Sequence, residues 1–90
     1  MSEIVRRSVA GTMESSDAYV ELEPGTNGIE IDIDSVVINQ FGAQIRSVVA
    51  EVLAEQGVEN ARVKLVDRGA LDCVIRARVE TAVLRGMEGQ

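Results

Sequence analysis

Two short segments in which apolar and charged residues alternate constrain the fold of this 90-residue chain more than any other feature. In residues 18–23 and again in residues 29–34, every second side chain is apolar, and most of the side chains between them are acidic. Alternation with a period of two is typical of β-strands that bury one face. Between the two segments, residues 24–28 read Pro-Gly-Thr-Asn-Gly, a composition suited to a turn. The pattern therefore predicts a β-hairpin with an acidic outer face.

Three further elements follow from the spacing of apolar residues. Residues 36–56 place apolar side chains three and four positions apart, which predicts one long amphipathic helix. Residues 61–65 alternate again, with Arg62 and Lys64 at the polar positions, and predict another strand. Residues 4–10 predict a first strand by a weaker alternation.

Residues 71–80 fit either a helix or a strand. A helix would align the apolar residues of this segment but would place Arg78 inside their stripe, whereas a strand turns Cys73 and Ile75 inward and Arg76 and Arg78 outward. We favour the strand, joined to the preceding one by a hairpin connection at residues 67–71 and followed by a short helical tail after Glu80.

This arrangement places basic and acidic side chains on one exposed sheet face. The basic set is Arg62, Lys64, Arg76 and Arg78, and the acidic set is Glu21, Glu23, Glu30 and Asp32. Since like charges opposite one another destabilise a sheet, a basic strand is a favourable neighbour for the acidic hairpin.

The expected fold class is therefore α+β: a mostly antiparallel sheet of four to five strands, with one long amphipathic helix packed on one face. Ninety residues form a single domain, 1–90, which we expect to end in a short flexible tail from about residue 86. With 46% apolar residues but only one Tyr, one Phe and no Trp, the core must be built from Val, Ile, Leu and Ala.

Charge and composition exclude several classes of function. The formal charge of −6 argues against general nucleic-acid binding, which needs a basic face. The first residues lack the apolar run of a signal peptide, and no segment approaches the roughly 20 apolar residues of a membrane span, so we expect a cytoplasmic protein without a membrane partner. Residues 10–59 hold ten acids and one base, whereas residues 60–90 hold four acids and six bases. This asymmetry fits either an acidic docking surface for a basic partner or two solvated faces that neutralise each other in the fold.

The residue types needed for catalysis or metal binding are scarce. The chain has no histidine, the usual general base and the commonest metal ligand, and we expect no metal site. Its single cysteine, Cys73, falls on the apolar side of the predicted strand, which indicates a buried structural residue. Acidic pairs at a spacing of two are better explained as the solvated face of strands than as pairs of catalytic carboxylates.

Residues 11–17 (Gly-Thr-Met-Glu-Ser-Ser-Asp) gather small, hydroxylic and acidic side chains without any periodicity, and predict a solvent-exposed loop between strands. Ser15 and Ser16 have no general base in the chain, so a reaction at either hydroxyl requires another enzyme. From the residues alone, the segment fits a turn whose hydroxyls bond the local backbone, or a phosphorylation site in a small adaptor domain.

Three segments carry a resemblance to a known family. These are the loop at 11–17, the tripeptide Gln-Phe-Gly at 40–42, and Gly-Ala-Leu-Asp-Cys-Val-Ile-Arg-Ala-Arg at 69–78. Over about residues 5–85 the chain resembles the acyl carrier protein (gamma) subunit of citrate lyase. Malonate decarboxylase has a carrier subunit of the same kind and is the alternative within the carrier class, but residues 69–78 favour the citrate lyase branch.

The resemblance implies a non-catalytic carrier. In this family a phosphoribosyl dephospho-coenzyme A arm is joined by a phosphodiester to the first serine after the glutamate of the loop motif, which is Ser15 in this chain. Met13 stands where Leu is more usual, and Ser16 occupies the variable place. The implied partners are a prosthetic-group transferase, an alpha subunit that exchanges acetyl for citryl on the thiol of the arm, and a beta subunit that cleaves citryl thioester to oxaloacetate.

Overall fold

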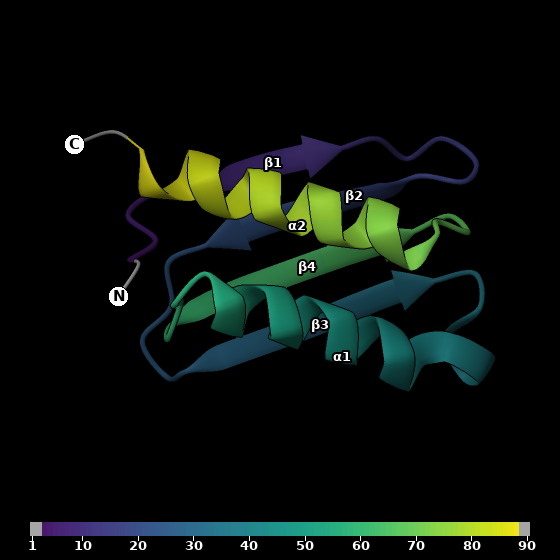
Figure 1. Ribbon diagram of the computed structural model, residues 1–90, viewed down its shortest axis with the longest axis horizontal. Coiled ribbons are helices and arrows are strands. Elements are labelled where there is room, and N and C mark those ends of the chain that lie inside the picture. The colour runs from purple at the N-terminus through teal and green to yellow at the C-terminus, as the bar shows by residue number, and fades with distance from the viewer. Residues whose placement is uncertain (1–2, 89–90) are drawn as a thin grey trace.

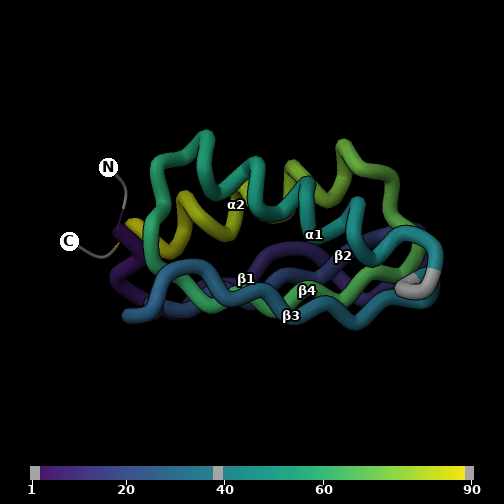
Figure 2. Tube along the Cα trace, turned by 90° about the horizontal axis from the view of Figure 1, so that it is seen from below, coloured from purple at the N-terminus to yellow at the C-terminus, as the bar shows by residue number. Residues whose placement is uncertain are grey.

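The computed structural model describes residues 3–88, without the side chains of residues 38 and 39. Its elements in chain order are β1 (Ser8–Gly11), β2 (Ala18–Glu23), β3 (Ile29–Ser35), α1 (Ile38–Glu55), β4 (Ala61–Asp67) and α2 (Asp72–Met87). The strands form one sheet in the order β1-β2-β4-β3, and both helices lie on the same face of it (Figures 1 and 2). The α+β class is confirmed, but two helices cover the sheet where one was predicted.

The predicted hairpin between residues 18–23 and 29–34 is wrong, because β4 lies between β2 and β3. β1 pairs with β2 and β2 with β4 in antiparallel fashion, whereas β3 and β4 run parallel. The sheet is therefore mixed and four-stranded rather than mostly antiparallel. A parallel pair requires a long crossover connection, and α1 supplies it between β3 and β4.

The positions of the charged side chains give a physical reason for this strand order. Lys64 stands opposite both Glu21 and Asp32, one on each side of β4. In the same way, Arg62 stands between Glu23 and Glu30. A β2–β3 hairpin would have placed acidic rows beside each other, which costs stability, whereas the inserted β4 separates them with bases. The prediction that Arg62 and Lys64 share a face with the acidic side chains is confirmed.

The strand predicted at residues 71–80 is also wrong, since these residues belong almost entirely to α2. The helix buries one face made of Ile75, Val79, Ala82, Val83 and Gly86, with the spacings of three and four expected of a helix. Consequently, residues 68–71 connect a strand to a helix rather than two strands. Arg76 and Arg78 lie on α2, away from the open sheet face where we expected them.

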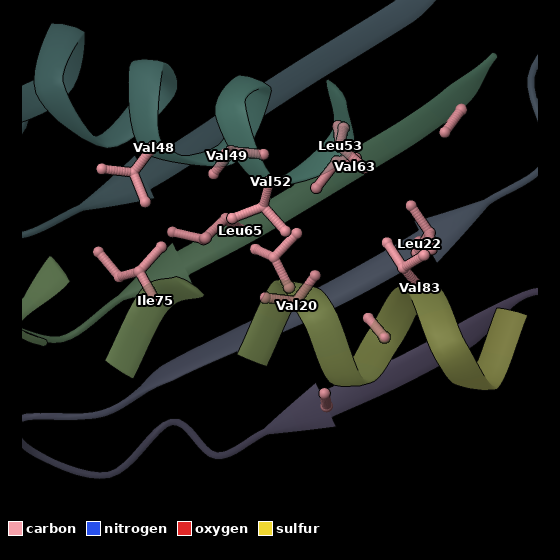
Figure 3. Packing of buried hydrophobic residues seen from close by; sticks show 14 of the residues in the cluster. Val20, Leu22, Val48, Val49, Val52, Leu53, Val63, Leu65, Ile75 and Val83 are labelled. Carbon is pink, nitrogen blue, oxygen red and sulfur yellow. The ribbon is translucent and has the colours of Figure 1, made fainter. Parts of the chain in front are cut away.

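The core lies between the sheet and the two helices (Figure 3). It consists of Val, Ile, Leu and Ala, as predicted. Among its residues are Val20, Leu22, Val63 and Leu65 from the strands, Val48, Val49, Val52 and Leu53 from α1, and Ile75 and Val83 from α2. The helix expected at residues 36–56 is confirmed as α1. Burying each such side chain contributes about 1.5–3 kcal/mol, which is how a small domain without large aromatic residues stays folded.

The N-terminal segment of the described chain lies against the C-terminal end of α2. The first strand is shorter than the expected residues 4–10, and the segment before it is held by the backbone N–H groups of Val5 and Arg6, which donate to the Gly86 carbonyl. The tail expected from about residue 86 overlaps the end of α2, which reaches Met87, and residues 89 and 90 lie outside the described part of the chain.

Candidate functional site

The loop between β1 and β2 extends from one end of the sheet into solvent (Figure 1). Residues 12–16 are all exposed, and the flanking Gly11 and Asp17 are half-buried. The expected exposed loop at residues 11–17 is thus confirmed. The connections from β3 to α1 and from β4 to α2 lie at the same end of the molecule, which we call the loop end.

The loop begins at a glycine that no other residue can replace without strain. Gly11 has a φ of +90°, in the left-handed region, and a Cβ atom there would collide with the carbonyl oxygen of Ala18. The close approach of these two backbones, across the mouth of the loop, is what permits the β1–β2 pairing to continue to its last residue.

A tight turn at residues 14–17 forms the tip of the loop. The backbone N–H of Asp17 donates to the carbonyl oxygen of Glu14 at 3.1 Å, so Ser15 and Ser16 are the two central residues. Ser16 has a φ of +66°, the positive value that a type II turn requires at its third position. The turn therefore places Ser15 at the corner where the chain reverses.

The two serines differ in how firmly they are held. The Ser16 backbone N–H donates to the carbonyl oxygen of Arg68 at 2.8 Å, and the Arg68 N–H donates to the carbonyl oxygen of Asp17 at 3.0 Å. These two bonds extend the β2–β4 ladder by one step into the loop. Within the described residues, both hydroxyls are exposed and form no hydrogen bond, but Ser15, unlike Ser16, also has a backbone N–H without a hydrogen bond.

Asp17 anchors the loop to the body of the protein. The guanidinium of Arg78 on α2 donates from Nε to Oδ1 and from Nη2 to Oδ2, each at 3.0 Å. The Thr12 hydroxyl donates to Oδ2 at 2.6 Å, and the Ala18 N–H donates to Oδ1 at 2.7 Å. This carboxylate thereby joins the start of the loop, the end of the loop and α2.

The bonds to Asp17 also set its protonation state. Hydrogen bonds from the Arg78 guanidinium, then from the Thr12 hydroxyl and the Ala18 N–H, hold the pKa of the Asp17 carboxyl well below its usual range. Asp17 therefore stays ionised and paired with Arg78 at neutral pH. Of the acidic loop residues that flank the serines, Glu14 alone faces solvent without such a bound cation in the described structure.

A second carboxylate supports the loop end from beneath. Asp67, at the end of β4, is buried, accepts a hydrogen bond from the Ser35 hydroxyl at 2.8 Å, and accepts another from the Ala70 N–H at 2.9 Å. Because Ser35 ends β3, this bond ties together the ends of the two parallel strands. Asp67 thereby fixes the connection that carries Arg68 beside the loop.

Sequence reasoning did not identify Arg68, Asp67 or Arg78 as parts of this site. For Arg78 a signal was present, namely a charged residue within an apolar helical stripe, which calls for a buried or half-buried partner. For Asp67, the spacing to Gly69 and Ala70 is that of a side chain that bonds the backbone two and three residues onward. Nothing local to Arg68 reveals that it pairs with the loop.

Cys73 corrects an expectation about the chemistry of the chain. It lies in the first turn of α2 and is exposed, not buried as predicted. The reason is the helix itself, because the helical period turns Ile75 and Val79 inward and leaves Cys73 on the solvent side. Among residues 3–88, no cluster of three or more His, Cys, Asp or Glu side chains is placed to hold a metal ion. Neither described helix is both long and apolar enough to cross a membrane.

Comparisons with known proteins relate the whole domain to acyl carriers. A model of the acyl carrier family described as the malonate decarboxylase delta subunit matches residues 5–86. The citrate lyase acyl carrier protein of Lactiplantibacillus plantarum is 52% identical over 86 residues, which are 96% of this chain and 90% of that protein. The protein of the same name from Cronobacter sakazakii is 54% identical over 87 residues, covering 97% of this chain and 90% of the relative.

A solved structure extends the similarity to the fold. The crystal structure of a Pseudomonas malonate decarboxylase hetero-tetramer in complex with malonate contains a chain that matches with a TM-score of 0.80 and 25% sequence identity. The match covers 93% of this chain and 87% of that chain. This chain therefore belongs to the acyl carrier protein family that includes the malonate decarboxylase delta subunit and the citrate lyase acyl carrier proteins.

Proposed function

We propose that this chain is the acyl carrier subunit of a citrate lyase complex, and that Ser15 is the attachment point of its prosthetic arm, phosphoribosyl dephospho-coenzyme A. The observation that carries the proposal is the exposed hydroxyl of Ser15, which forms no hydrogen bond within the described residues and lies at the tip of a loop whose flanks are anchored. The relatives named citrate lyase acyl carrier protein, at about half identity over nearly the whole chain, support the choice of complex.

The residues around Ser15 fit an arm joined through a phosphodiester. The hydroxyl is sterically open, and the negative charge of Asp17 is already compensated by Arg78. Arg68 lies beside Ser16, is exposed, and its guanidinium joins no ion pair in the described structure. It is the residue that we expect to hold the phosphodiester oxygens, since a guanidinium binds phosphate through paired N–H donors.

The role of the chain is to hold the prosthetic arm and present it to the catalytic subunits, without catalysing a reaction itself. When bound, the arm supplies a terminal thiol on which acetyl and citryl groups are carried as thioesters. The chain contributes a hydroxyl for attachment and a loop that is rigid at its flanks, so the anchor point stays at a defined place while the arm moves. We assign acetyl-for-citryl exchange to the alpha subunit and citryl cleavage, which releases oxaloacetate, to the beta subunit.

Ser15 is favoured over Ser16 by the way each is held. Ser16 adopts a left-handed conformation, and its N–H is bonded to the β4–α2 connection, so its movement toward another active site would break the turn. The hydroxyls of both serines form no hydrogen bond within the described residues, but the backbone N–H of Ser15 forms none there either, so Ser15 can approach a transferase without breaking a bond that holds the loop.

The experiment that tests this function is co-expression with the prosthetic-group transferase, followed by intact-mass measurement. We expect a single large addition to the wild-type chain, none to Ser15→Ala, and a normal addition to Ser16→Ala. The Ser15→Ala chain should still assemble with the alpha and beta subunits, but the complex should not cleave citrate. Full modification and cleavage with Ser15→Ala would refute the assignment.

A carrier for malonate decarboxylase is the second candidate, favoured by the family description and by the solved structure. The two candidates are distinguished by supplying the loaded chain to the catalytic subunits of each complex. Citrate cleavage without malonate decarboxylation is the expected result, because the relatives named for citrate lyase are about twice as similar to this chain as the malonate decarboxylase chain is.

A further inference from the structure

A groove lined mostly by apolar residues lies at the loop end, between the first half of α1 and the connection from β4 to α2. Its volume is about 520 Å³, and its apolar lining consists of Val37, Phe41, Ile45, Ala70 and Leu71. The connection that forms one wall is the same segment whose Arg68 bonds the serine loop. The groove and Ser15 therefore open at the same end of the molecule.

Exposed apolar side chains are concentrated at this end. Of the seven large apolar residues that are exposed among the described residues, four lie in or beside its connections. These are Leu71, with 71% of its surface exposed, Val36 with 62%, Met13 with 54% and Phe41 with 48%. Clustered exposed apolar groups mark sites where another molecule binds, because each costs free energy while it faces water.

The charges around these apolar groups select the kind of occupant. Asp72 lines the groove and Glu14 lies on the serine loop, and both are exposed acids, whereas Arg68 is the exposed base there that joins no ion pair among the described residues. Counted over these three residues, the rim carries a net negative charge. A second copy of the chain would bring two acidic rims together, which disfavours self-association through this surface.

We propose that the loop end is the surface on which the prosthetic-group transferase docks, by means of an apolar contact in the groove surrounded by basic side chains. This inference rests on the proposed function. The transferase must bring a phosphorus atom within bonding distance of the Ser15 oxygen, so its surface must cover the neighbourhood of the loop. Partners that act at the far end of a long arm have no such requirement.

The chemistry of the transfer explains why the transferase should be basic at this interface. The Ser15 oxygen forms a bond to phosphorus of a phosphoanhydride-activated arm, the anhydride bond breaks, and a phosphate-containing anion leaves. The serine proton passes to a base of the transferase, because this chain has no histidine. A site that binds such a donor is rich in Arg and Lys, and these complement the acidic rim.

The first test is the rate of arm transfer at varied concentrations of the carrier, followed by intact mass. Leu71→Ser should raise KM about tenfold and leave kcat within about twofold, since it removes an apolar contact without touching Ser15. The variant should fold, because Leu71 occupies the N-cap position of α2 with an extended backbone, where Ser is favoured. Leu84→Ser, an exposed position near the other end of α2, is the matched control and should leave KM unchanged.

A second pair of variants tests the electrostatic attraction between the acidic rim and the transferase. Asp72→Asn should raise KM and make it less sensitive to salt, because it removes one attraction for a basic partner while its amide oxygen can still accept from Gln44. Glu59→Gln changes the charge equally, but in the connection between α1 and β4 at the opposite end, and should have little effect (Figure 1).

A binding measurement separates this inference from the proposed function. Transferase should bind the Ser15→Ala chain as tightly as wild type and the Leu71→Ser chain about tenfold more weakly. If the wild-type chain accepts no arm, the proposed function fails. If it accepts the arm but Leu71→Ser and Leu84→Ser bind alike, the docking surface is refuted. A wild-type dimer that Leu71→Ser dissociates would also refute it, since a second copy would then cover the groove.

Discussion

Asp17 and Arg78 are separated by 61 residues in sequence and joined by two parallel hydrogen bonds, each 3.0 Å long. One residue closes the serine loop and the other lies on α2, so the pair fixes the loop relative to the helical layer. Such a two-point contact between guanidinium and carboxylate restrains direction as well as distance. The position of Ser15 at the tip of the loop therefore depends on a helix that begins 57 positions after it.

Removal of the Asp17 charge should destabilise the fold more than removal of an exposed ion pair. Asp17→Asn keeps a side chain of similar shape but weakens the bonds to Arg78 and Thr12, and should lower the free energy of unfolding by about 1–3 kcal/mol. Arg62→Gln, which breaks an exposed pair with Glu23 at 3.8 Å, should cost less than about 1 kcal/mol. Urea denaturation followed by circular dichroism measures both. Equal losses would show that the Asp17–Arg78 contact does not anchor the loop.

The same carboxylate predicts a pH dependence. Its pKa in the folded protein is below the ordinary value of 3.8, so the folded state releases the proton more readily than the unfolded state. The contribution of Asp17 to stability is complete above the unfolded pKa and is lost as the pH falls toward the folded one. The stability difference between wild type and Asp17→Asn should therefore be larger at about pH 5 than at about pH 3. A constant difference over this range would contradict the depressed pKa.

Gly11 should tolerate no side chain. Gly11→Ala combines the cost of a left-handed backbone, about 1–2 kcal/mol, with a collision against the Ala18 carbonyl, and should destabilise the protein by about 2–5 kcal/mol. Gly28→Ala is the control, because Gly28 has a φ of +83° but open space around the added carbon. It should show only the backbone cost. Thermal denaturation of the two variants compares them directly, and equal effects would mean that the loop mouth can widen.

Cys73 should react under native conditions. Since its side chain is exposed on the first turn of α2, a thiol reagent such as Ellman's should modify it without denaturant, at a rate within about tenfold of that in the unfolded protein. Cys73→Ser should change stability by less than about 0.5 kcal/mol, as is usual for surface positions. If the thiol reacts only after the protein unfolds, Cys73 is buried and the exposed position is wrong.

Local patterns in the sequence determined which residues face inward in the segments that fit a single period. The alternation in residues 18–23 and 29–34 identified two strands and their buried sides, the spacing in residues 36–56 identified α1, and the absence of any period in residues 11–17 identified the exposed loop. These predictions succeeded because the direction of a side chain depends on the period of its own segment.

The choice of neighbours was decided only by the tertiary structure. Alternation shows which side of a strand is buried but not which strand lies beside it. It therefore left open whether β2 pairs with β3 or with β4. The balance of acidic and basic rows on the open sheet face favours β4. Residues 71–80 fit two periods, and the helix prevails because Asp17, far away in sequence, supplies the anion that Arg78 requires within its apolar stripe. The partner that makes each arrangement favourable lies in another segment, and local sequence alone does not reveal it.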